Sequence, residues 1–216
     1  MLFRSGPGEG GLYTLVPRDA STPTVPFPTR LSETGLFADL PRHRPVAGAI
    51  PYAVTSPLWS DGASKERFVV WPTGTAGEAP PTIDVDGGDR GWTLPEGCVT
   101  VKSFALDVPT ADGPRRRWIE TRVMVRQQGE WTGYSYRWND AQTDADLVDG
   151  SGGEAEVEVA TAAGPRRQTW RFPSRTECMV CHSRAANFAL GLSTPQLNRP
   201  FDYGGPTVRS EEHTSE

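Results

Sequence analysis

The sequence predicts a mainly β fold, an antiparallel and sandwich-like sheet domain that is followed by a short α-helical segment. The first observation is the composition, since 23 Gly and 20 Pro among 216 residues indicate many turns and short elements. The second is a series of segments in which apolar and polar residues alternate between turn signals. Because consecutive strands are joined by short turns, we expect an antiparallel sheet or sandwich.

The first 30 residues are expected to lie outside this sheet. Residues 8–17 predict a glycine turn and a short apolar strand, and they resemble the last strand of the β-propeller in glucose/sorbosone-dehydrogenase-like proteins. We therefore assign residues 1–18 to the end of an upstream domain. Residues 19–30 contain three prolines and predict an extended linker.

Residues 31–175 form the predicted β-rich domain. We expect its main strands at residues 67–71, 99–106, 118–125, 131–138, 155–160 and 167–172. In the fourth of these strands, Tyr134, Tyr136 and Trp138 are predicted to share one face. Residues 138–149 hold four Asp, but they lack the glycine and the closing Glu of a calcium-binding loop, so we expect an acidic turn or short helix.

The run before the first strand has two interpretations. Trp59, Asp61 and Lys65 would make a polar contact site if all three faced a ligand. The structural interpretation, which we favour, puts Trp59 in the core, Asp61 at a turn and Lys65 in solvent.

The sharpest motif is Cys178-Met179-Val180-Cys181-His182, which has the C-x-x-C-H spacing of c-type haem attachment. Two thiols three positions apart lie on one side of a helical turn, where each can form a thioether with one haem vinyl group. His182 then provides the axial imidazole ligand of the iron. The residues that follow, through Leu192, favour helix.

Two other interpretations of the motif remain open. A thioredoxin-like C-x-x-C needs a βαβ setting, which the strand-rich sequence upstream does not offer. A structural zinc site needs a second ligand pair, and the chain has only one other Cys and two other His.

Three further residues have side chains of the kinds that bind metal ions. His43 is a candidate second iron ligand, but a surface loop histidine is the favoured interpretation. Met124 is a candidate sixth ligand, although a methionine on a sheet face is more often core filler. Cys98 has no partner outside the motif and is expected to be a small buried strand residue.

Several classes of protein are disfavoured by the charge and hydropathy. The formal net charge of -5 argues against nucleic-acid binding, and no apolar run approaches a membrane span. No apolar signal-peptide core follows Met1, whereas haem attachment of this type takes place outside the cytoplasmic membrane. We therefore expect a fragment of an exported, periplasmic protein. Residues 209–216 back-translate to a common sequencing adapter and are treated as an artefact.

Several runs together resemble a bacterial c-type cytochrome family in which a β-rich region precedes the haem motif. The runs are Leu31-Ser-Glu-Thr-Gly-Leu-Phe37, Ser56-Pro-Leu-Trp-Ser-Asp61, Pro95-Glu-Gly97, Ile119-Glu-Thr-Arg122, Tyr134-Ser-Tyr-Arg-Trp-Asn-Asp140 and the C-x-x-C-H motif itself. Some members follow a sugar-dehydrogenase-like propeller that uses pyrroloquinoline quinone (PQQ).

The resemblance implies one covalent haem c, with Cys178 and Cys181 as thioether sites and His182 as the axial ligand. Residues 176–208 would then be the start of a truncated, α-helical cytochrome c domain. The implied partners are an upstream PQQ-dependent sugar or alcohol dehydrogenase and a downstream respiratory electron acceptor. PQQ itself, and any catalytic residue, would belong to the upstream domain.

A second function comes from a different class. The chain would be a non-catalytic β-sandwich that binds carbohydrate or a partner protein, with Cys178 and Cys181 as a disulfide or metal clip. Exposed Trp59, Trp131 or Trp138 would provide its stacking surfaces.

Overall fold

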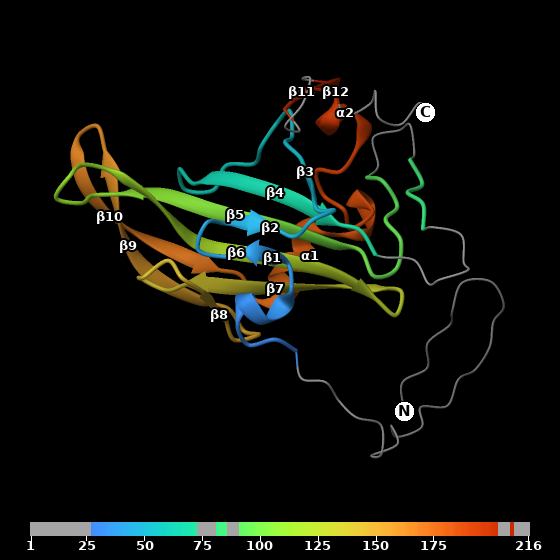
Figure 1. Ribbon diagram of the computed structural model, residues 1–216, viewed down its shortest axis with the longest axis horizontal. Coiled ribbons are helices and arrows are strands. Elements are labelled where there is room, and N and C mark those ends of the chain that lie inside the picture. The colour runs from blue at the N-terminus through green and yellow to red at the C-terminus, as the bar shows by residue number, and fades with distance from the viewer. Residues whose placement is uncertain (1–26, 73–80, 86–90, 203–207, 210–216) are drawn as a thin grey trace, which may run out of the picture.

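The computed structural model describes residues 27–72, 81–85, 91–202 and 208–209 (Figure 1). Its centre is a six-stranded antiparallel sheet with the order β3-β4-β5-β6-β7-β8. The strands are β3 (Ile50–Pro51), β4 (Ser64–Val70), β5 (Val99–Val108), β6 (Arg115–Gln127), β7 (Glu130–Trp138) and β8 (Ala145–Leu147). Strands that are consecutive in sequence are neighbours in the sheet, and the predicted short turns join β5 to β6 and β6 to β7.

Shorter elements surround this sheet. The two-stranded pairs are β1 (Phe37–Asp39) with β2 (Arg44–Pro45), β9 (Gly153–Thr161) with β10 (Gly164–Phe172), and β11 (Pro200–Phe201) with β12 (Val208–Arg209). The α-helices are α1 (Arg175–Cys181) and α2 (Thr194–Leu197), and the 3-10 helices are η1 (Leu31–Thr34) and η2 (Arg184–Ala186). Within the described residues, no helix has the length and apolar character that a membrane crossing requires.

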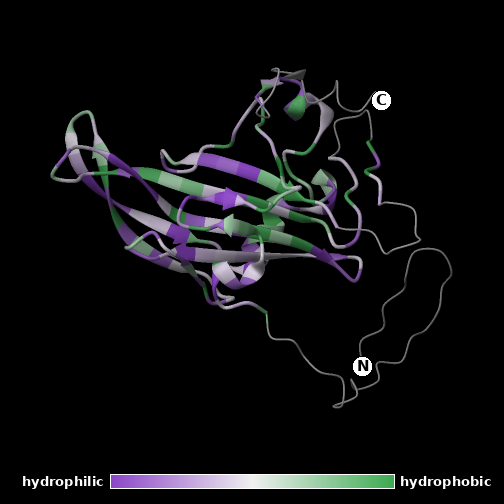
Figure 2. Ribbon diagram, viewed as in Figure 1, coloured by the Kyte–Doolittle hydropathy of each residue, from purple (hydrophilic) through white to green (hydrophobic). Residues whose placement is uncertain are grey.

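One face of the central sheet packs under the N-terminal segment. Purple and green stretches alternate along the long strands in Figure 2, as expected where successive side chains point to opposite faces. The core on this face contains Leu31, Leu36, Leu40, Phe68, Val101, Val123, Tyr136 and Trp138. Tyr134 packs against the same cluster, so the predicted shared face of Tyr134, Tyr136 and Trp138 is confirmed.

The opposite face is covered at its two ends by different elements. The β9–β10 hairpin packs over one end through a cluster of Phe104, Leu106, Val159, Trp170 and Phe172. At the other end, α1 and the segment that follows it pack on the sheet through Met124, Cys178, Ala189, Leu192 and Leu197. Figure 1 shows the hairpin at the left of the view, with α1 and α2 toward the right. At this second end a cavity is lined by the central sheet, by α1 and the segment after it, and by residues between 52 and 60.

The mainly β part of the predicted fold is confirmed, whereas the α-helical cytochrome c segment is wrong. Helix α1 has seven residues and α2 has four, and the expected helix through Leu192 is a short 3-10 turn followed by a loop. The physical reason is visible in the backbone, because Asn187 and Phe188 have φ of 45° and 60° and end any right-handed helix there. A seven-residue helix is too short to be stable alone, so packing on β7 must hold α1 in place.

Several predicted segments fall outside the described residues. They are the upstream domain end at 1–18, most of the linker at 19–30, and residues 210–216 of the suspected artefact. Of that last segment, Arg209 lies in β12, where its backbone pairs with Pro200.

Candidate haem-attachment site

Helix α1 carries the C-x-x-C-H motif, and a capping box fixes where it begins. The backbone N–H of Glu177 donates to Ser174 Oγ over 3.1 Å, and the backbone N–H of Ser174 donates to Glu177 Oε2 over 2.8 Å. The bond from Ser174 and the nearby Arg171 guanidinium lower the pKa of Glu177 to about 2. The first turn of α1 is therefore anchored one residue before Cys178.

A glycine on the sheet allows α1 to approach closely. A Cβ on Gly133 of β7 would lie 2.8 Å from Cys178 Cβ, and 2.9 Å from both Cys178 Sγ and Met124 Sδ. Cys178 is accordingly buried, and its burial raises the pKa of the thiol. Any larger residue at position 133 would displace the helix or the thiol.

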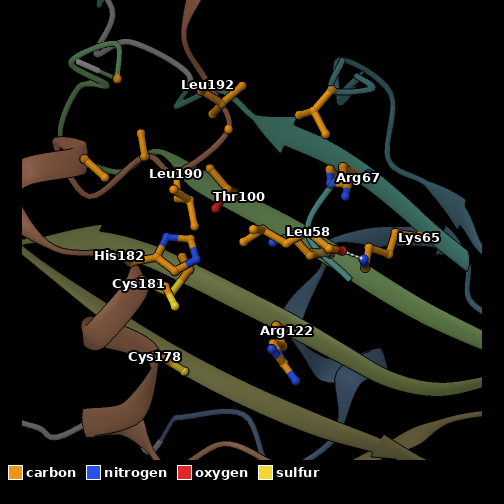
Figure 3. A pocket seen from close by; sticks show the side chains of 18 of the residues that line it. Leu58, Lys65, Arg67, Thr100, Arg122, Cys178, Cys181, His182, Leu190 and Leu192 are labelled. Atoms are coloured by element: carbon orange, nitrogen blue, oxygen red, sulfur yellow. Dashed lines mark hydrogen bonds between the residues drawn. The ribbon is translucent and has the colours of Figure 1, made fainter. Parts of the chain in front are cut away.

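The two motif cysteines and His182 face one cavity. Figure 3 shows Cys178 on α1 and Cys181 and His182 at its C-terminal end, with the three side chains on the same side. Cys178 is buried, Cys181 is exposed, and both are free thiols. The backbone N–H of His182 donates to the carbonyl oxygen of Cys178 over 3.0 Å and closes the helix.

The imidazole of His182 is oriented by a backbone carbonyl. Its Nδ1 lies 2.8 Å from the carbonyl oxygen of Phe188, which can only accept, so the proton sits on Nδ1. Burial lowers the pKa of His182 and favours the neutral ring. The lone pair is thereby left on Nε2, which is the arrangement that metal-ligating histidines commonly have.

The loop that supplies this carbonyl is held by a segment almost 100 residues earlier. Asn187 Nδ2 donates to the Gly91 carbonyl over 3.1 Å and to Thr93 Oγ1 over 2.7 Å. The backbone N–H of Trp92 donates to the Leu192 carbonyl over 2.7 Å. These bonds stabilise the left-handed turn at residues 187–188 and with it the orientation of His182.

The cavity has a volume of about 450 Å³, which lies within the range of small-molecule and cofactor sites. Its apolar wall comes from two segments that are far apart in the sequence and includes Tyr52, Val54, Leu58, Ala189, Leu190 and Leu192. Its polar wall is mainly cationic and comes from the sheet, through Lys65, Arg67, Lys102 and Arg122. An apolar ligand that carries negative charge fits this lining.

The spacing of the motif side chains bears on which group they can hold. No cluster of three metal-ligating side chains lies among the residues that the structure describes, so the two thiols and the imidazole do not converge on one ion. All three side chains line the cavity. Tetrahedral zinc needs four converging ligands, and these three side chains alone do not supply them.

Of the other candidate ligands, Met124 lies at the site and His43 does not. The expected surface position of His43 is wrong, because the ring is 8% exposed and is held by Glu66 at 3.0 Å and Ser103 at 2.7 Å. Ser103 follows Lys102 in β5, so this network lies on the sheet face opposite the cavity. Met124 is buried beside Cys178, as expected of core filler, and lines the wall of the cavity.

The favoured interpretation of Trp59 is also wrong, since this side chain is 81% exposed at the edge of the cavity. Trp131 and Trp138 are 7% and 5% exposed, so neither offers a stacking surface. Lys65 is half-buried and donates to the Leu58 carbonyl instead of pointing into solvent. The expected burial of Cys98 is confirmed, and this burial raises the pKa of its thiol to about 12.

The acidic run at residues 138–149 serves the fold. The backbone N–H of Asn139 donates to the Asp144 carbonyl over 2.9 Å, which closes the expected turn before β8. The Asp144 carboxylate accepts from the backbone N–H and the hydroxyl of Ser32. The run therefore ties the central sheet to η1.

Apart from Lys65, the cationic wall is the part of the site that sequence reasoning missed. The signal was present in the strand alternation, because Lys65 and Arg67 share one parity in β4 and Lys102 has the cavity-facing parity in β5. Comparisons of the chain with protein families, curated proteins and solved structures found no match.

Proposed function

We propose that this chain is a haem c-binding electron-transfer module, with thioethers at Cys178 and Cys181 and an axial ligand at His182. One observation carries the proposal: the Nδ1–H of His182 is held by a carbonyl beside two free thiols on the same cavity wall. The bound haem would supply one-electron chemistry, and the protein would supply ligation, orientation and electrostatics.

Attachment needs only what the two cysteines provide. Each thiol would add across one vinyl double bond of the haem, with sulfur bonding to the carbon next to the ring and the thiol hydrogen passing to the outer carbon. The addition consumes no oxidant or reductant. The raised pKa of Cys178 keeps it as a thiol and slows competing oxidation.

His182 contributes a preoriented neutral imidazole. The hydrogen bond to Phe188 restricts rotation of the ring, and the lowered pKa reduces competition from protons for Nε2. Both effects favour metal ligation at neutral pH.

The physiological placement follows from the resemblance. The module would be exported to the periplasm, take electrons from a PQQ-dependent sugar or alcohol dehydrogenase, and pass them to a respiratory acceptor. Reduction of the purified module by such a dehydrogenase, followed in the Soret band, tests this placement.

The attachment itself is tested by export of the chain in a host with haem-maturation machinery and haem staining after a denaturing gel. We expect the wild type and the cysteine control Cys98→Ala to stain. Cys178→Ala and Cys181→Ala should each weaken the stain, and the double variant should lose it. An unstained wild type, or a stained double variant, would contradict the proposal.

The carbohydrate- or partner-binding alternative retains one specific support, the exposed Trp59 beside the cavity. It predicts a Cys178–Cys181 disulfide or stoichiometric zinc in purified protein that has no Soret band. It also predicts carbohydrate binding that is lost in Trp59→Ala.

A further inference from the structure

Three cations stand side by side on the sheet face that lines the cavity. Arg67 of β4 is the direct cross-strand partner of Lys102 in β5, and Lys102 is the direct partner of Arg122 in β6. All three line the cavity. Like charges directly opposite on neighbouring strands are destabilising, so this row needs a compensating charge.

Only one of the three is compensated by the protein. Arg122 forms two bonds of 2.8 Å to the buried carboxylate of Glu120. Among the described residues, Arg67 and Lys102 have neither an ion pair nor a side-chain hydrogen bond.

The acidic lining of the cavity does not supply the missing charge. Its one described acidic residue is Glu177, whose carboxylate is engaged by the Ser174 backbone and by Arg171. The cavity therefore carries uncompensated positive charge.

Lys102 is the central member of the row, and it is half-buried. Burial, with the neighbouring charges of Arg67 and Arg122, lowers the pKa of Lys102 to about 8. A lysine kept in such surroundings is typical of a functional site more often than of a stabilising contact. An anion in the cavity would offset both the burial of the Lys102 charge and its repulsion by Arg67 and Arg122.

The position of the row matches one part of a haem. Figure 3 shows Arg67 across the cavity from Cys178, Cys181 and His182, with Arg122 nearer to Cys178, and Lys102 lies between these two arginines in the sheet register. The two propionates of a haem project from the edge of the ring opposite the edge that bears the vinyl groups. Thioethers at the α1 wall would thus direct the propionates toward the cation row.

We propose that Lys102 and Arg67 bind the two haem propionates through charge-assisted hydrogen bonds, while Arg122 adds positive charge from its pair with Glu120. This inference rests on the proposed haem attachment. It gives the β domain a direct part in holding and tuning the cofactor, since cations near the ring stabilise its reduced form.

The first test measures reversible binding to the full chain that carries Cys178→Ala and Cys181→Ala. Haemin and haemin dimethyl ester, which lacks both propionate charges, are titrated and followed in the Soret band. We expect Lys102→Gln and Arg67→Gln each to weaken haemin binding about tenfold and to leave binding of the diester unchanged. The exposed Arg167→Gln in β10 is the matched control and should change neither.

Equal affinity of the unsubstituted cavity for haemin and the diester would overturn the propionate assignment. So would equal losses for both ligands in Lys102→Gln. Thermal unfolding of each variant guards against misfolding, because removing one of several like charges is expected not to lower the melting temperature.

The second test uses the covalently loaded protein, in which the thioethers retain the haem whatever the charge at positions 67 and 102. Lys102→Gln and Arg67→Gln should lower the reduction potential, because loss of a nearby cation favours the ferric state, whereas Arg167→Gln should not. If haem is attached and all four proteins have the same potential, the propionate assignment fails while the proposed function stands. If no haem is attached at Cys178 and Cys181, both fail.

Discussion

The Nδ1 atom of His182 lies 2.8 Å from the carbonyl oxygen of Phe188, six residues further along the chain. The carbonyl points toward the ring because residues 187 and 188 both adopt left-handed backbone conformations. This short turn therefore orients the His182 ring through the Phe188 carbonyl, which a helix continued through residues 187 and 188 would not do. The tautomer of the proposed axial ligand depends on this turn.

The side chain of Asn187 stabilises this turn through its hydrogen bonds to Gly91 and Thr93. Asn187→Gly keeps the left-handed backbone but removes both side-chain hydrogen bonds, so we expect it to lower the free energy of unfolding by about 1–3 kcal/mol. Asn187→Ala should cost roughly 1 kcal/mol more, because an L residue with a Cβ disfavours this φ. Urea unfolding measures both, and wild-type stability of the two variants would show that the turn needs no anchor.

Gly133→Ala tests the close packing of α1 on the sheet. The new Cβ would stand within 3.0 Å of Cys178 and Met124, so we expect a loss of about 1–3 kcal/mol and weaker haem attachment at Cys178. Gly153→Ala is the control, since its Cβ would meet nothing nearer than Val148 at 3.9 Å. Equal effects of the two substitutions on unfolding and on the haem stain would contradict the close-approach argument.

Glu120 and Arg122 are predicted to act as a unit. Arg122→Met leaves the fully buried carboxylate of Glu120 without its cation and should cost about 3–5 kcal/mol. Adding Glu120→Gln removes that charge, while the amide oxygen can still accept from Trp170 Nε1 and the amide NH2 can donate to the Ser135 hydroxyl, so the double variant should be more stable than Arg122→Met alone. A double-mutant cycle by chemical denaturation measures the coupling, and simple additivity would argue against a buried ion pair.

Lys102 predicts a distinct pH dependence in the haem-free protein. Its pKa in the folded state is lowered to about 8, whereas an unfolded lysine titrates near about 10.4. Between these values the unfolded chain binds more protons, so this residue makes stability rise with pH across that window. Below pH 8 the penalty is fully present, and Lys102→Met should there raise the free energy of unfolding by on the order of 1 kcal/mol.

The measurement is the difference in stability between wild type and Lys102→Met from pH 7 to pH 10. A difference is required because Cys98 also titrates in this range. Its pKa is raised to about 12 in the folded state, so its contribution to stability falls as pH rises above 9 in both proteins. The advantage of Lys102→Met should shrink as pH rises. An advantage that is constant with pH would show that Lys102 is not strained by its surroundings.

The sequence was sufficient for the β5-β6-β7 meander because its short turns and its alternation are both local signals. It was insufficient where long-range contacts override local preference. His43 looked like a loop residue, but Glu66 and Ser103 from two strands bury it at a φ of 52°. Trp59 looked like core, but the run that carries it lines the edge of the cavity, and its ring is exposed.

The attachment motif was found for a similar reason, since its spacing within one helical turn is a local signal. The row of cations was not found from the sequence. Arg67, Lys102 and Arg122 are separated by 35 and 20 positions and become neighbours only through the register of the strands. Alternation alone put these residues on the polar face of each strand. Only the register showed that these faces join into one wall beneath the motif.

The most direct test of haem attachment is mass spectrometry of the intact exported chain after denaturation, followed by mapping of the modified peptide. We predict a mass increase of one haem that survives denaturation and maps to the peptide with Cys178, Cys181 and His182. An unmodified chain from a host that matures other c-type cytochromes, or an increase that maps elsewhere, would contradict the account.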